Sequence, residues 1–132
     1  MFSDADRDQF DAELEQVLAE LPESIRRLLD EVPLYVEDRP SPAVLRDLRV
    51  DNPATLCGLY SGVPLTEPAS REFRRTPDAI SIYRAGIMNA ATDAQGRIGA
   101  AELRRQIRIT ILHEMGHHHG LSEADLRDLG YG

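Results

Sequence analysis

The segment at residues 113–119 reads HEMGHHH and contains all four histidines of the chain. His113 and His117 are four residues apart, and on an α-helix that spacing places two side chains on one face. Two imidazoles on one face can bind a zinc ion at about 2.0–2.1 Å. Glu114 lies about 100° around the helix from His113, so it is expected to reach a metal-bound water and not the metal. The sequence therefore predicts a metal site with Glu114 as general base.

A catalytic zinc ion needs a third protein ligand and an open position. The run HEMGHHHGLSE fits the pattern H-E-x-x-H-x-x-G-x-x-ligand, in which a glycine turns the chain back toward the metal. Glu123, just beyond Gly120, is the expected third ligand. Asp125 is the alternative, and an upstream residue or a solvent ligand stays open. Both acids also have structural explanations, because Ser122 and Asp125 have capping-box spacing and Glu123 falls in the first turn of that helix.

The other two histidines point away from this face. His118 and His119 are directed about 140° and 120° from His113, so neither can join the same ion while the helix is intact. We expect His118 to pack or hydrogen-bond and His119 to lie near the surface. Gly116 lowers the stability of the helix by about 1 kcal/mol relative to alanine. A close approach of a strand, a metal or a substrate would explain its presence.

The pattern of apolar residues predicts the elements that carry this motif. Helices are expected at residues 3–20 with Ser3 as cap, after Pro22, at 41–48, at 100–119 and from Ser122. Strands are expected at residues 32–38, 55–60 and 79–88. Residues 61–78 read as a long loop of the kind that is often functional, and residues 89–99 as a polar turn. Helices at both ends of a small three- to four-stranded sheet indicate an α+β fold.

Charge and composition restrict the partners. The chain of 132 residues fits a single domain, residues 1–132, with an acidic helical segment at 1–31. Residues 1–40 contain 12 acidic residues and 4 arginines, whereas residues 41–132 contain 11 of each. Without a basic face, nucleic acid is not an expected partner. No apolar run could cross a membrane, and no signal peptide is recognisable, so we expect a cytoplasmic protein. Cys57, the one cysteine, is expected to be a buried small apolar residue.

Three segments resemble the small bacterial zincin-like metallopeptidases, in the same order along the chain. They are GLYSGVPLTE (58–67), AISIYR (79–84) and ILHEMGHHHGLSEADLRDLGY (111–131), and the resemblance covers most of the chain from about residue 20. It implies a compact zincin-like fold, with a short sheet over the active-site helix, and zinc peptidase activity. The chain departs from the pattern at His119, where an aromatic residue is more usual, and it has no Met-turn after the metal motif.

The resulting hypothesis is a zinc-dependent endo- or aminopeptidase that acts on a peptide or protein as a monomer or weak homo-oligomer. Zincins bind substrate as an added strand at a sheet edge, and residues 79–88 are the expected edge. Tyr83 could face the cleft or be a half-buried strand residue. Tyr131 could donate to a developing oxyanion or simply pack. The alternatives are a zinc-binding regulatory or interaction module without turnover, and a structural site closed by four protein ligands.

Overall fold

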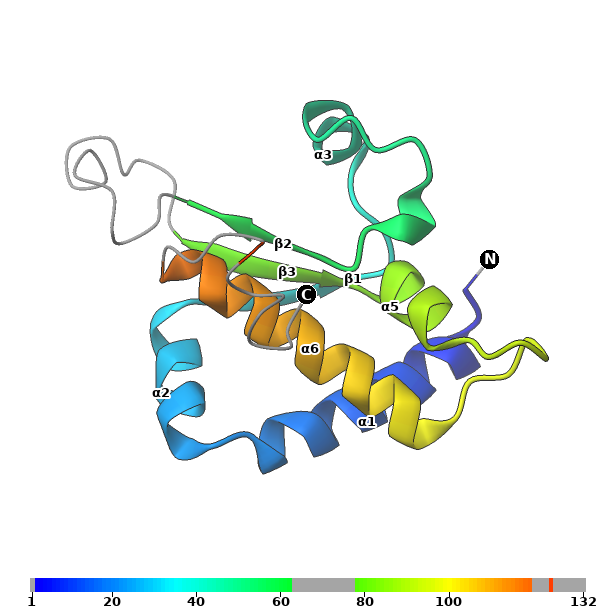
Figure 1. Ribbon diagram of the computed structural model, residues 1–132, viewed down its shortest axis with the longest axis horizontal. Coiled ribbons are helices and arrows are strands. Elements are labelled where there is room, and N and C mark those ends of the chain that lie inside the picture. Colours follow the sequence, from blue (N-terminus) through cyan, green and yellow to red (C-terminus); the bar gives the residue numbers. More distant parts are fainter. Residues whose placement is uncertain (1, 63–77, 120–123, 125–132) are drawn as a thin grey trace.

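The computed structural model describes residues 2–62, 78–119 and 124 (Figure 1). In chain order the elements are α1 (Asp4–Glu20), α2 (Glu23–Glu31), β1 (Leu34–Glu37), α3 (Pro42–Asp47), the 3-10 turn η1 (Pro53–Thr55), β2 (Gly58–Ser61), β3 (Ala79–Tyr83), α5 (Arg84–Ala91) and α6 (Ala100–His118). These helices around one small mixed sheet confirm the α+β class. The loop predicted at residues 61–78 and the helix predicted from Ser122 lie largely outside the described residues.

The sheet has three strands in the order β1-β3-β2 among the described residues. β3 is parallel to β1, with Ile80 opposite Leu34, and antiparallel to β2, with Ile80 opposite Tyr60. β3 is therefore the central strand. The expectation that residues 79–88 form an edge is wrong, because a partner is hydrogen-bonded on each side of β3.

The strand predicted at residues 79–88 is also too long. β3 ends at Tyr83, and α5 begins at the next residue, Arg84. The apolar run AGIM contains Gly86, which lies so close to Leu56 that a Cβ would overlap the Leu56 carbonyl oxygen. A short apolar run that is buried on all sides has no periodicity that separates strand from helix. The helix that begins here packs closely against a distant segment at Gly86.

The core lies between the sheet and the two long helices. In Figure 1, α6 runs across the sheet and α1 lies alongside α6. Buried side chains come from α1, β3, α5 and α6: Phe10, Leu14, Val17, Ile80, Ile82, Ile87, Leu103, Ile107 and Ile111. The N-terminal helix is thus packed and not a free arm. None of the described helices is long and apolar enough to span a bilayer.

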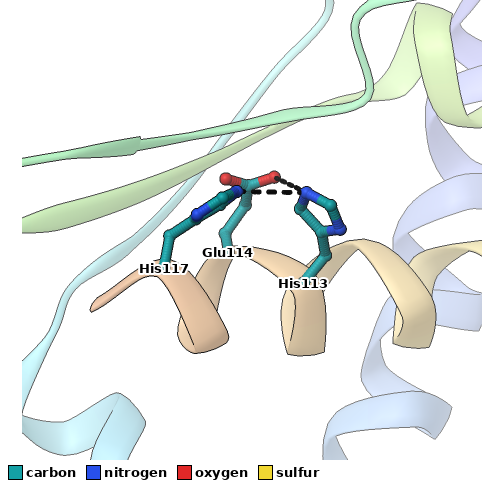
Figure 2. Close-up of side chains that lie close together, drawn as sticks. All are labelled: His113, Glu114 and His117. Atoms are coloured by element: carbon teal, nitrogen blue, oxygen red, sulfur yellow. Dashed lines mark hydrogen bonds and ion pairs between the residues drawn. The ribbon is translucent and has the colours of Figure 1, made fainter. Parts of the chain in front are cut away.

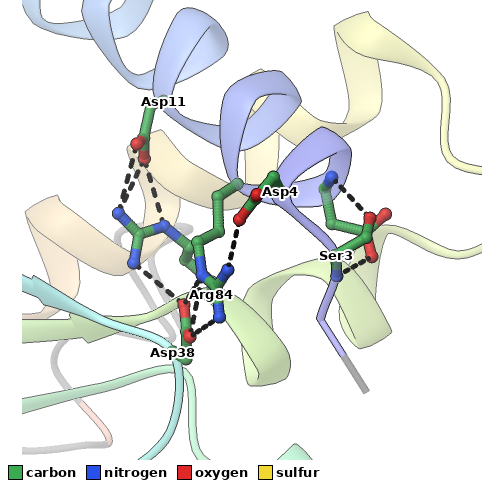
Figure 3. A network of polar contacts seen from close by, with 7 residues as sticks. Ser3, Asp4, Asp11, Asp38 and Arg84 are labelled. Atoms are coloured by element: carbon green, nitrogen blue, oxygen red, sulfur yellow. Dashed lines mark hydrogen bonds and ion pairs between the residues drawn. The ribbon is translucent and has the colours of Figure 1, made fainter.

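Four charged side chains fasten α1 to the sheet and to α5 (Figure 3). Arg7 donates to both carboxylate oxygens of Asp38, with Nη2 2.8 Å from Oδ2. Arg84 joins Asp38 to Asp11, with distances of 3.0 Å to Asp38 Oδ1 and 2.9 Å to Asp11 Oδ1. The hydrogen bonds from Arg7, and then those from Arg84, keep the pKa of Asp38 below its usual value. Asp38 therefore joins α1 and α5 most strongly while it is ionised.

We expect Asp38→Asn to lower the free energy of unfolding at pH 7 by about 1 kcal/mol, because charge-assisted bonds are lost at a partly exposed site. The pKa is depressed in the folded state, so this stabilisation is complete above the unfolded pKa of about 3.9 and is lost as pH falls below it. Urea unfolding between pH 7 and pH 3 should show the two proteins converging in acid. A gap that stays constant down to pH 3 would contradict this role.

Candidate metal centre

The C-terminal half of α6 carries the motif. α6 spans Ala100–His118, and its buried stripe of Leu103, Ile107 and Ile111 faces the core. This stripe fixes the rotation of the helix. His113 and His117 are consequently partly buried, whereas Glu114 is 7% exposed. The long helix predicted at residues 100–119 is confirmed, and so is the shared face of the two histidines.

The two imidazoles are placed as a metal would require (Figure 2). His113 Nε2 and His117 Nε2 are 3.2 Å apart, and the rings are inclined at 77° to each other. Two nitrogens bound to one tetrahedral zinc at about 2.0–2.1 Å are about 3.3–3.4 Å from each other. The observed separation therefore fits two ligands of a single ion.

The Glu114 carboxylate lies beside both histidines. Its Oε2 is 3.9 Å from His113 Nε2, and one possible ligand atom from each of the three residues lies within 4.8 Å of the others. The group could hold a metal ion. The angle of Glu114 around the helix predicts that it reaches a metal-bound water and does not bind the metal itself. The flexible side chain nevertheless brings the carboxylate close to the imidazoles, so its distance alone does not exclude it as a ligand.

Strand β2 covers Glu114 at Gly58. A Cβ on Gly58 would lie 3.2 Å from Glu114 Cγ and 2.8 Å from Thr110 Cγ2. The second distance is shorter than side-chain packing allows, so only glycine lets β2 approach α6 this closely. Gly58 opens the segment GLYSG, for which the sequence offered no physical role. The glycine at position 58 was the feature of the sequence from which the closeness of β2 to the site could have been inferred.

Two further residues near Glu114 are held neutral by burial. Burial raises the pKa of the Cys57 thiol, and the charge of Glu114 adds to the effect. Burial also raises the pKa of Tyr83, with smaller effects from Glu37 and Glu114. Cys57 is only partly buried, so the expected burial is met in part, and its raised pKa disfavours the thiolate. Tyr83 is 2% exposed, so it is a core residue and not a residue facing a cleft.

The remaining expected residues divide into two groups. His118 is buried and His119 is exposed at the end of α6, as predicted. Gly116 is buried. The candidate third ligands Glu123 and Asp125 lie outside the described residues, as do Gly120, Ser122 and Tyr131.

A paired-histidine helix beneath a small sheet defines the class of zincin-like domains, and comparison with known families agrees. The family described as zincin-like metallopeptidase matches residues 29–132, which is most of the chain. The protein belongs to that family. No curated protein matches the chain.

Proposed function

We propose that this protein is a zinc-dependent peptidase. In this proposal His113 and His117 bind zinc, Glu123 completes the protein ligands and Glu114 is the general base. The observation that carries the proposal is the 3.2 Å separation of the two Nε2 atoms next to a buried carboxylate, in a member of a metallopeptidase family. Glu123 is included because of its spacing from His117 in the sequence.

Bound zinc would supply a water whose pKa is lowered to about 7 and would polarise the peptide carbonyl. Glu114 accepts a proton as the water oxygen forms a bond to the carbonyl carbon. Glu114 then delivers a proton to the amide nitrogen as the carbon–nitrogen bond breaks. His113 and His117 do not move protons in this scheme, because their Nε2 atoms face the metal position.

The contact with Gly58 favours Glu114 as base over Glu114 as ligand. Gly58 lies so close to the Glu114 stem that a Cβ at this position would be 3.2 Å from Glu114 Cγ, and we infer that β2 limits how far the carboxylate can swing onto the ion. A base must stay within about one water molecule of the metal, and a fixed stem provides that. The third protein ligand is then a residue beyond α6, and Glu123 is the candidate.

We infer that the substrate binds along β2 as an added strand. β2 is the outer strand of the described sheet on the side away from β1, and a Cβ at Gly58 in this strand would lie 3.2 Å from Glu114 Cγ. Neighbouring strands are about 4.8 Å apart, so an extended peptide paired with β2 passes within reach of the proposed base. This replaces β3 as the expected edge, because β3 is paired on both sides.

The proposal is tested by metal loading and a peptide library. We expect the purified protein to bind about one zinc ion, to cleave some members of a broad library, and to lose cleavage when a chelator removes the zinc. Added zinc should restore it. Zinc binding with no cleavage across the library would instead favour a regulatory module that lacks turnover, and no zinc binding would contradict both functions.

A further inference from the structure

Three polar side chains from separate elements meet at the end of α6 next to the proposed metal site. Tyr60 lies in β2, Asp78 directly precedes β3 and His118 is the last residue of α6. The Tyr60 hydroxyl donates to Asp78 Oδ1 at 3.0 Å. His118 Nδ1 lies 3.4 Å from Asp78 Oδ2 and 3.4 Å from the Tyr60 oxygen. We call these three residues the α6 clamp.

The α6 clamp has a defined pattern of hydrogens. The Tyr60 hydrogen points to Asp78, so the Tyr60 oxygen and the carboxylate both present lone pairs to His118. An imidazole nitrogen that faces two acceptors must carry a hydrogen to interact favourably with either. His118 is therefore expected to carry its hydrogen at Nδ1, an orientation that ties the ring to both strands.

Breaking these contacts would be energetically costly because the side chains are buried. The side chains of Asp78 and His118 are 8% and 5% exposed. A buried carboxylate without partners is costly, so Asp78 stabilises the arrangement only while its partners stay in place. Gly62, with φ of +127°, brings the backbone after β2 directly against Asp78. The end of the β2–β3 pair is thereby fixed around the carboxylate.

This anchoring matters because of where His117 lies. His117 is the second-last residue of α6, and carbonyls in the last turn of a helix lack partners within the helix. Terminal turns open more easily than helix interiors. Any fraying would move His117 relative to His113, which lies one turn earlier. His118 is adjacent to His117, so its contacts with the strands hold the turn that carries the ligand.

We propose that Tyr60, Asp78 and His118 are positioning residues that keep His117 at metal-binding distance from His113. The inference rests on the proposed function, since it assumes that the two histidines bind zinc. It also assigns a role to the segment GLYSG: Gly58 sets the position of Glu114, and Tyr60 sets that of the following turn of α6.

The test is zinc affinity in Tyr60→Phe, which removes one oxygen atom and keeps the ring. We expect zinc affinity, measured by competition with a chelating dye, to fall about tenfold, in the range found when partners of metal sites are removed. The visible spectrum of the cobalt-substituted protein should change, because His117 is less well fixed. In peptide cleavage kcat should fall more than KM rises. Tyr35→Phe, at an exposed tyrosine of β1, is the matched control and should leave all three unchanged.

Asp78→Asn and the double variant extend the test. Asp78→Asn should also weaken zinc binding, and the double variant should be little worse than the more affected single variant, because both changes break the same cluster. If Asp78→Asn fails to fold, Tyr60→Phe still decides.

The outcomes separate the two proposals. A parent protein that binds zinc, with Tyr60→Phe unchanged in zinc affinity and cobalt spectrum, would overturn the α6 clamp alone, even if the melting temperature of the metal-free variant fell. A parent that binds no zinc would overturn the proposed function and the clamp's role together.

Discussion

Replacing Glu114 with glutamine is expected to leave zinc binding near that of the parent and to lower peptide hydrolysis by about 10²–10⁴-fold. Glutamine has the same length and fits the space beneath Gly58, where Glu114 Cγ packs. Its amide cannot accept the proton that the carboxylate would take from water. Zinc content, zinc affinity and cleavage of a substrate found in the library screen measure the two effects separately.

Glu123→Gln is the informative comparison. If Glu123 is the third ligand, its replacement should weaken zinc binding, whereas Glu114→Gln should not. The reverse pattern would make Glu114 the ligand, which its place within 4.8 Å of both imidazole nitrogens allows. A Glu114→Gln protein that cleaves peptide as fast as the parent would show that the general base has been assigned to the wrong residue.

The candidate metal-binding face could be predicted because it depends on one helix. His113 and His117 share a face by helical spacing alone, and the apolar stripe of α6 settles which way that face is turned. His118 was predicted to pack or hydrogen-bond for the same reason, and it does. Nothing beyond the geometry of a single element was needed for these results.

The surroundings of the candidate metal site could not be predicted because they depend on contacts between distant segments. Tyr60 and His118 are separated by 58 positions, and their meeting follows from how β2 lies over α6. The central place of β3 likewise depends on which strands pair with it, and alternation in one strand carries no such information. The change from β3 to α5 at Arg84 is accompanied by a close approach of Gly86 to Leu56, which is 30 positions away in the sequence.

The N-terminal helix raises a separate question, because α1 lies before the part of the chain that the family match covers, residues 29–132. We propose that residues 1–132 fold as one domain in which α1 is indispensable. Phe10 is 0% exposed and Val17 is 1% exposed, both within the core that also contains the α6 stripe. Glu13 pairs with Arg104 of α6 at 2.8 Å, so α1 is joined to the helix of the candidate metal site by apolar and by charged contacts.

Phe10→Ala is therefore expected to lower the free energy of unfolding by about 3–5 kcal/mol, the usual cost of emptying a phenylalanine site in a core. Domains of this size are stable by about 5–15 kcal/mol, so a large share of the stability would be lost. Urea unfolding of the metal-free protein measures the change, with Phe2→Ala as control because Phe2 is only partly buried. A protein lacking residues 1–21 should not unfold cooperatively. If it did, and still bound zinc like the parent, α1 would be an accessory segment and the domain would begin near residue 22.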